Sequence, residues 1–207
     1  SSSVQEIASS YEQHGANAIS VLTDKKYFGG SLENLQIANT STQSTPLLMK
    51  DFFVDTYQVY LARYYGADAI LLIVSLLSAE QINHFIELAR DLGMDALVEV
   101  HSESEVEIAL KTNAEIIGVN NRDLHSFKVD TNTFIRIGSK IPENYVRVAE
   151  SGYTPANASS IQGFANAVLI GSSIMKSDDM GSAIQAIKAP VKKFKACGIR
   201  TLAAAQY

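Results

Sequence analysis

Two ionisable residues lie within apolar segments of the sequence. Lys50 ends Pro-Leu-Leu-Met-Lys, and Glu99 lies inside Ala-Leu-Val-Glu-Val. Because a buried carboxylate without a partner is costly, Glu99 requires a cationic or hydrogen-bonding neighbour, and Lys50 is the natural candidate. A lysine there can protonate a carbonyl or hydroxyl oxygen, or hold an anion. The alternative is a surface lysine engaged in salt bridges.

A second carboxylate, Glu150, ends Val-Arg-Val-Ala-Glu and is followed by Ser151. Acid and base groups held in different environments can divide protonation and deprotonation between them. Lys50, Glu99 and Glu150 are therefore candidates for acid–base chemistry at one site. The alternative is two unrelated structural carboxylates.

Polar and small residues follow other apolar segments. The Asn-Asn-Arg triplet from Asn120 to Arg122 could hydrogen-bond sugar hydroxyls and reach a phosphate, although Asn is also common in turns. Gly152, and Gly171 with Ser172, follow the last two apolar segments. Backbone amides at such positions form the phosphate site that barrels often build, but Gly-Ser pairs are also common in plain turns.

The histidines do not indicate a metal site. His14, His84, His101 and His125 show no recognisable ligand spacing with a carboxylate or cysteine, so we expect no metal. The sequence also lacks a nucleophile elbow and a Gly-rich nucleotide loop. These patterns disfavour serine hydrolases and nucleotide-dependent enzymes.

The candidate residues are positioned by short apolar segments rich in Val, Ile and Leu. Such continuous runs are typical of buried parallel strands. The predicted strands are 18–22, 47–52, 69–73, 96–100, 116–120, 146–150 and 167–171. Between them lie helical patterns, such as one that ends at Gly93 as a C-cap. Regular alternation with polar strand ends predicts an α/β fold, a TIM (β/α)8 barrel whose strand ends share one mouth.

Composition limits the class of protein. The 207 residues are 46% hydrophobic and 19% charged, which predicts one globular domain. The net charge of -5 argues against a nucleic-acid surface. No apolar run reaches the roughly 20 residues needed to span a membrane, and no signal peptide is evident. With a single cysteine, Cys197, we expect a cytoplasmic protein.

Successive strings resemble, in order, the motifs of indole-3-glycerol phosphate synthase. They are AISVLTDKKYFGGSLENL, PLLMKDFFVDTYQVYLARYYGADAILLIVSLL, LGMDALVEVHSESE, IIGVNNRDLHSFKVD, VAESGYTP and AVLIGSSIM. The resemblance extends from about Val4 to about Met175. It implies cofactor-free, metal-free ring closure of 1-(2-carboxyphenylamino)-1-deoxyribulose 5-phosphate, a small phosphosugar, with loss of CO2 and water.

The resemblance also implies roles for single residues. Lys50 would be the general acid acting on the ribulose oxygen, and Glu99 would support the catalytic lysines. Asn120 would bind substrate hydroxyls, while Glu150 and Ser151 would serve the later proton removal. The implied substrate-binding residues are Arg122, Gly152, Gly171 and Ser172 for the phosphate, and Leu22, Phe28, Phe52 and Leu71 for the anthranilate ring.

The sequence departs from the family pattern at its start. The family carries a first strand of the form Glu-x-Lys followed by Ser-Pro-Ser, preceded by an extra helix, and neither is found before residue 18. We therefore expect residues 1–190 to form a barrel lacking its first strand and N-terminal helix. The missing strand supplies a second catalytic lysine, so we expect this chain to be inactive or severely impaired until that strand is added back.

The C-terminal tail carries a second resemblance. FKACGIRTLAAAQ is similar to the opening strand of phosphoribosylanthranilate isomerase, so residues 191–207 are interpreted as a linker and the first strand of a fused isomerase domain that contains Cys197. Alternatively, residues 194–199 pack as a terminal strand in the vacant first-strand position, where Lys193 or Lys195 partly replaces the missing lysine.

Two other functions remain open at this stage. One is a noncatalytic phosphate-binding or regulatory barrel that kept the pocket but lost the chemistry of the first strand. The other is a different phosphosugar barrel, such as the isomerase itself, which only the tail supports. Turnover measurements on the full-length protein would separate the first from an enzyme.

Overall fold

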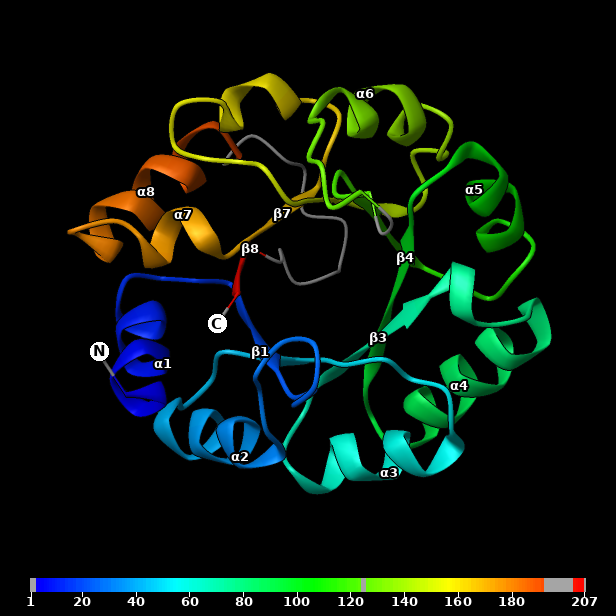
Figure 1. Cartoon of the computed structure of the whole chain (residues 1–207), viewed down its shortest axis with the longest axis horizontal. Coiled ribbons are helices and arrows are strands. Elements are labelled where there is room, and N and C mark those ends of the chain that lie inside the picture. Colours follow the sequence, from blue (N-terminus) through cyan, green and yellow to red (C-terminus); the bar gives the residue numbers. More distant parts are fainter. Residues whose placement is uncertain (1–2, 124–125, 192–202, 207) are drawn as a thin grey trace.

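The computed structural model describes residues 3–123, 126–191 and 203–206. Parallel strands form a closed barrel surrounded by helices (Figure 1). The strands are β1 (Ala18–Leu22), β2 (Leu47–Lys50), β3 (Ala69–Ile73), β4 (Asp95–Val100), β5 (Ile116–Asn120), β6 (Val146–Glu150), β7 (Ala167–Ile170) and β8 (Ala203–Gln206). The helices are α1 (Val4–Gln13), α2 (Leu32–Ser41), α3 (Thr56–Tyr64), α4 (Ala79–Asp91), α5 (Glu103–Ala109), α6 (Asn132–Gly138), α7 (Ser172–Met175) and α8 (Met180–Val191), with short 3-10 helices η1 (Val74–Leu76) and η2 (Ala158–Ile161). The predicted barrel is confirmed, with small differences in strand bounds.

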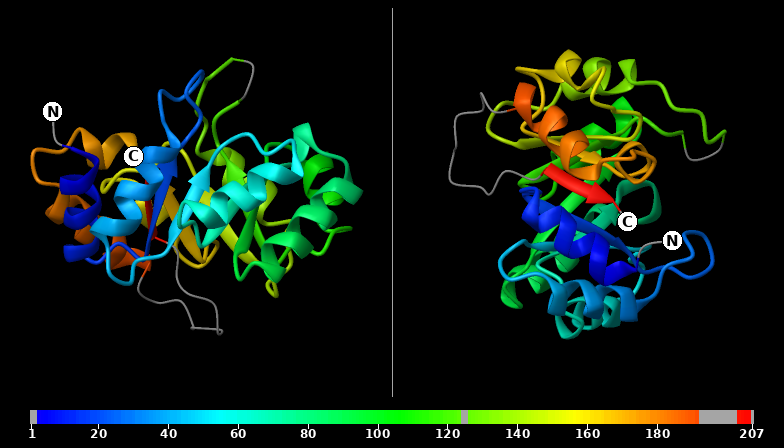
Figure 2. Two further views of the ribbon diagram at one scale, coloured as in Figure 1. Left: turned by 90° about the horizontal axis from the view of Figure 1, so that it is seen from below. Right: turned by 90° about the vertical axis from the view of Figure 1, so that its left-hand side faces the viewer.

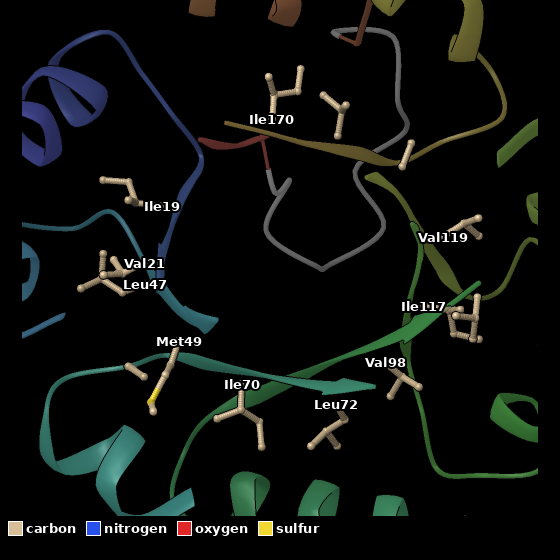
Figure 3. Packing of buried hydrophobic residues seen from close by; sticks show 14 of the residues in the cluster. Ile19, Val21, Leu47, Met49, Ile70, Leu72, Val98, Ile117, Val119 and Ile170 are labelled. Carbon is tan, nitrogen blue, oxygen red and sulfur yellow. The ribbon is translucent and has the colours of Figure 1, made fainter. Parts of the chain in front are cut away.

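Two apolar cores lie on the two faces of the strands. Successive side chains of a strand point to opposite faces, so each of the strands β1 to β7 contributes to both cores. The side chains labelled in Figure 3 point outward from the strands toward the helices. The barrel interior is filled by Ala18, Leu48, Leu71, Ile73, Leu97, Ile116, Val148, Ala167 and Leu169. This double burial explains why the strands are continuously apolar in sequence.

Helix α4 illustrates how local sequence sets the helix bounds. Ser78 and Gln81 form a capping box at its start, where each side chain satisfies a backbone N–H of the other residue. Gly93 follows the helix with φ of +74°, a left-handed conformation that favours glycine. The predicted stop at Gly93 is thus confirmed, and the turn leads directly into β4.

The barrel is closed by β8, which lies between β7 and β1 (Figure 1). Ala204 aligns with Ala18 of β1 and with Leu169 of β7, in parallel register with both. The sequence predicts a barrel with a gap at this position, or with a strand at residues 194–199 in that place. The gap is absent, because residues 203–206 form a strand there. Residues 194–199 lie outside the described residues, together with Lys193. A strand here pairs the edges of β1 and β7, which an open barrel would leave with unmet backbone hydrogen bonds.

The long loops after β1 and β5 rise from the same end of the barrel (Figure 2, left). This is the end at which the parallel strands terminate, where barrel enzymes carry their active sites. Within the described ranges, no helix is both long and apolar enough to cross a membrane.

Candidate active site

Three ionisable side chains from different strands meet inside the barrel mouth. The Lys50 ammonium lies 3.3 Å from Glu99 Oε2 and 3.9 Å from Glu150 Oε2. The exposed fractions of these residues are only 7%, 1% and 1%, respectively. The expected pairing of Lys50 with Glu99 is therefore present, and Glu150 joins the same cluster.

Strand register explains this convergence. Lys50 aligns with Leu22 of β1, and Glu99 aligns with Ile73 of β3. Glu150 ends β6 opposite Asn120. Each ionisable residue stands two positions beyond an inward-facing apolar residue of its own strand, so the alternation of side chains directs it inward too.

The neighbours of Glu99 keep it ionised. Burial opposes its charge, but the Lys50 ammonium and the His101 ring outweigh that effect and hold the pKa of Glu99 well below its usual value. The pKa of Lys50 is raised, because the attraction of Glu99 and Glu150 outweighs the effect of burial. Lys50 is therefore a charged proton donor, and Glu99 is its anionic partner.

Glu150 has the opposite tendency. Burial and the nearby Glu99 charge raise the pKa of Glu150 well above its ordinary value, although Lys50 acts against this shift. Two adjacent carboxyl groups are thus pushed toward different protonation states. Such a separation is a common basis for assigning one residue to electrostatic support and the other to proton transfer.

Gly118 provides the space for the Glu150 carboxyl group. A Cβ atom at position 118 would lie 2.0 Å from Glu150 Oε1 and 3.1 Å from Leu97 Cδ1. No side chain larger than hydrogen fits without moving the carboxyl group. Sequence analysis did not single out Gly118, although a glycine within the apolar strand Ile-Ile-Gly-Val-Asn is a signal of close approach.

The turn after β6 is strained and tightly held. Ser151 has φ of +65°, a conformation that is costly for a residue with a side chain. The buried Asn121 side chain donates to the Ser151 carbonyl at 2.9 Å and accepts from the Phe134 amide at 2.8 Å. Asn121 thus has a structural role, while the half-buried Asn120 accepts from the Arg122 amide at 3.0 Å.

The predicted phosphate-binding residues lie on neighbouring loops at the mouth. Gly152 packs against Val129, which forms a bridge with Arg122. The Arg122 guanidinium is exposed and donates to the Phe127 carbonyl at 3.3 Å. The Ser173 hydroxyl donates to the Tyr153 carbonyl at 3.0 Å, which joins the loop that follows Gly152 to helix α7.

Gly171 and Ser172 stand at the start of that helix. Gly171 is the N-cap residue of α7, and Ser172 is its first residue. Both follow β7 directly, so they lie at the same end of the barrel as Glu150.

Of the predicted ring-binding residues, Phe28 and Phe52 lie together. Their rings stack with centroids 5.1 Å apart, and Tyr27 contacts Phe52 edge-on at 5.5 Å. Leu22 is the partly exposed last residue of β1. Leu71 is fully buried and aligns with Leu97, one interior layer below Glu99, so it forms part of the floor beneath the charged residues.

The loops that carry the aromatic residues are fixed by two carboxylates. Asp24 Oδ2 accepts from the Tyr27 and Phe28 amides, the latter at 3.3 Å. Asp51 accepts from the Thr23 hydroxyl and from the Phe52 amide at 2.8 Å. In the part of the chain that the structure describes, no group of three or more His, Cys, Asp or Glu side chains is arranged to hold a metal ion.

Solved structures with the same fold differ widely in sequence. The thiamine phosphate pyrophosphorylase from Pyrococcus furiosus superposes with a TM-score of 0.71 and 18% identity, covering 92% of this chain and 90% of its own. KGPDC from Streptococcus mutans superposes with a TM-score of 0.67 and 12% identity, covering 91% of this chain and 92% of its own. At these identities, the similarity concerns the fold alone.

Sequence relatives are more informative. The family model for indole-3-glycerol phosphate synthase matches residues 1–187. The indole-3-glycerol phosphate synthase of Dehalococcoides mccartyi is 49% identical over 181 residues, covering 86% of this chain and 70% of the relative. That of Leptospira interrogans is 46% identical over 179 residues, covering 86% and 71%. The chain therefore belongs to the indole-3-glycerol phosphate synthase family.

Proposed function

We propose that this chain catalyses the ring closure of 1-(2-carboxyphenylamino)-1-deoxyribulose 5-phosphate to indole-3-glycerol phosphate, with release of CO2 and water. The observation that carries the proposal is the buried Lys50–Glu99–Glu150 cluster at the barrel mouth. This cluster supplies an acid and a carboxyl group of raised pKa within one dry site. Membership of the family supports the same reaction.

In this proposal, the anthranilate ring carbon attacks the ribulose carbonyl carbon, and Lys50 donates a proton to the carbonyl oxygen as the new carbon–carbon bond forms. The donor is charged and buried, so it stabilises negative charge on that oxygen more strongly than a solvated amine would. Glu99 holds the ammonium in place and remains anionic. Loss of the carboxylate as CO2 then leaves the new carbon–carbon bond.

Glu150 and Ser151 serve the dehydration step. The protonated Glu150 carboxyl group gives its proton to the hydroxyl group, which leaves as water, and the carboxylate formed in this way removes the proton whose loss makes the indole ring aromatic. A carboxyl group whose pKa is raised by burial accepts a proton more readily once it has ionised, which suits Glu150 to this step. Ser151, which follows Glu150 directly and has φ of +65°, assists at the same step.

Substrate binding is assigned to the surrounding loops. We propose that Arg122, with the backbone of Gly152, Gly171 and Ser172, binds the phosphate, because glycines and helix starts present N–H groups to anions. Phe28 and Phe52, with Leu22, receive the anthranilate ring, and Leu71 closes the floor below it. Asn120 binds the sugar hydroxyls. Sites of this kind combine apolar walls with a few polar groups.

The direct test is turnover. The purified chain is incubated with the substrate, while product mass and CO2 release are followed. A second arm uses the extended chain, in which the part of the Dehalococcoides mccartyi relative outside the 70% match is joined to this chain. Ring closure is expected in at least one arm and should be lost in Lys50→Met. If both proteins are folded and neither forms product, the proposal is wrong.

We also propose that the protein acts in the cytoplasm. We propose in addition that residues 191–207 are the linker and first strand of a fused phosphoribosylanthranilate isomerase domain. The similarity of the tail, including Cys197, to that enzyme supports the fusion. Pairing of β8 with β7 and β1 argues for an alternative role within this barrel. A chain ending at Val191 separates the two: an unchanged unfolding midpoint favours the fusion, and a lower midpoint favours barrel closure.

A further inference from the structure

His101 lies beside Glu99, one residue beyond the end of β4. Its Nε2 atom is 3.1 Å from Glu99 Oε1, whereas Lys50 Nζ is 3.3 Å from Glu99 Oε2. The two oxygens of Glu99 are thus engaged by two different cationic groups. The exposed fractions of the Glu99 and His101 side chains are 2% and 11%, so water screens these contacts little.

The His101 ring is held in this orientation by Glu105. Glu105 Oε2 accepts a hydrogen bond from the His101 backbone amide at 2.8 Å and lies 3.4 Å from the ring Nδ1. Glu105 belongs to the first turn of α5, which is capped by the Ser102 hydroxyl. Because both backbone and ring are fixed by the same carboxylate, Nε2 is directed toward Glu99.

Glu150 lacks such support. Within the described part of the chain, no histidine forms an ion pair with its carboxyl group, and the nearby Glu99 carboxylate repels its charge. Its nearest cation is Lys50, at 3.9 Å, and Lys50 lies closer to Glu99. The charged groups that His101 contacts are Glu99 on β4 and Glu105 on α5. Its charge also acts on Glu150 of β6, more weakly than the Glu99 and Lys50 charges do, while Lys50 of β2 contacts the other oxygen of Glu99. The two glutamates thus differ in their distance from Lys50 and in whether His101 forms an ion pair with them.

The charge on His101 is consistent with this geometry. Burial opposes protonation of the ring, but Glu105 and Glu99 outweigh it and raise the pKa of His101 to about 9. The ring is therefore a cation at neutral pH. A neutral ring would leave Lys50 as the single cation shared by two carboxyl groups.

We infer that His101, held by Glu105, is a positioning residue that decides which of the two buried glutamates carries the negative charge. It keeps Glu99 ionised and leaves the proton on Glu150. The inference rests on the proposed function, because it assigns the roles of the two glutamates in that reaction. His101 acts through Glu99 and does not contact the reacting atoms.

The test follows the titration of the two carboxyl groups in the full chain. Carboxyl carbons of 13C-labelled glutamate are observed by NMR, and the Glu99 and Glu150 signals are assigned by their loss in Glu99→Gln and Glu150→Gln. His101→Gln keeps a hydrogen-bond donor but removes the charge. We expect the Glu99 midpoint to move up by about one pH unit and the difference between the Glu99 and Glu150 midpoints to narrow. Unchanged midpoints for both residues would overturn the inference.

Variants on α5 provide the matched control. Glu105→Gln weakens the hold on the ring and should narrow the difference between the midpoints by a smaller amount, which keeps the inference testable if His101→Gln does not fold. Glu103→Gln removes a partly exposed carboxylate of the same helix, which pairs with Lys140 at 2.8 Å, and should move neither midpoint. His101→Lys restores a positive charge and should return the midpoints toward their original values.

The NMR readout does not depend on turnover, so the two proposals can fail separately. Shifted midpoints in a chain that forms no product in either arm support the inference and count against the proposed function. Where product forms, the pH profile of kcat should move with the Glu150 midpoint in His101→Gln. A profile that stays fixed while the midpoints stay fixed would leave His101 with a structural role only, and the inference would be wrong.

Discussion

Two layers of the barrel interior share the same strands but differ in chemistry. In the lower layer, β2, β4 and β6 contribute Leu48, Leu97 and Val148. Two residues further along the same strands, the mouth layer receives Lys50, Glu99 and Glu150. Both layers are almost completely buried, with no exposed fraction above 7% among these six residues. Burial therefore does not distinguish the functional layer, but the cost of burying its side chains does.

Stability and chemistry reside in different layers of the barrel. Apolar side chains of the lower layer gain free energy when they leave water. The charged side chains of the mouth layer lose the favourable free energy of hydration, and their attraction to one another offsets this loss only in part. A buried ion pair therefore contributes little net stability. The lower layer thus supports a mouth layer that is organised for proton transfer. Variants in the two layers should separate these contributions.

The largest effect is expected for Lys50→Met in the mouth layer. Loss of a positioned general acid should lower kcat/KM by about 10³-fold in the ring-closure assay. Two carboxyl groups would remain without their shared ammonium, so the pKa of Glu99 should also rise. Lys140→Met, which removes an exposed lysine, is the control. Retention of more than about a tenth of the activity in Lys50→Met would contradict the assignment.

Next in size is Leu48→Ala, two residues earlier on the same strand. Truncation of a buried leucine should lower the free energy of unfolding by about 2–5 kcal/mol, measured by urea denaturation. Below its unfolding transition, the variant should keep kcat within a few fold, because Leu48 lies in the apolar layer below the charged residues. Leu48→Met preserves volume and should be much milder. A large loss of kcat in the folded variant would mean that the layers are not separable.

A smaller effect is expected for Gly118→Ala, which lies between the layers. The added methyl group would displace the Glu150 carboxyl group, and a misplacement of about 1 Å can reduce kcat by about 10²-fold. In the double variant with Glu150→Asp, the shorter side chain makes room for the methyl group and should recover part of the loss. If Gly118→Ala alone keeps full activity, then Gly118 does not position Glu150.

The smallest effect concerns stability as a function of pH in Glu150→Gln. The folded-state pKa of Glu150 lies above the unfolded value of about 4.5, so its proton stabilises the fold fully below that value. This contribution is lost as pH rises through the folded-state pKa. Gln does not titrate, so the variant should gain stability relative to the parent as pH rises over that interval, and then level off. Parallel stability curves for both proteins would show that Glu150 is not buried with a raised pKa.

Much of the barrel could be predicted from sequence because strand formation here depends on local composition. Strands buried on both faces require continuous apolar runs, and polar residues at or near the end of such a run lie at the mouth. Lys50, Glu99 and Glu150 could be identified in this way. Burying a charged residue without a partner is costly, so a charged residue in an apolar run must have one. For this reason the sequence alone predicts the contact between Lys50 and Glu99.

Tertiary structure alone decided how these residues act on one another. Which glutamate is ionised depends on distances to Lys50 and His101, and those distances depend on register between strands that are far apart in sequence. The need for Gly118 likewise depends on the position of a side chain from the next strand. The same holds for β8, since strand pairing rather than local pattern selected residues 203–206 to lie between β7 and β1. Sequence determined which residues face the mouth, and packing determined their charge.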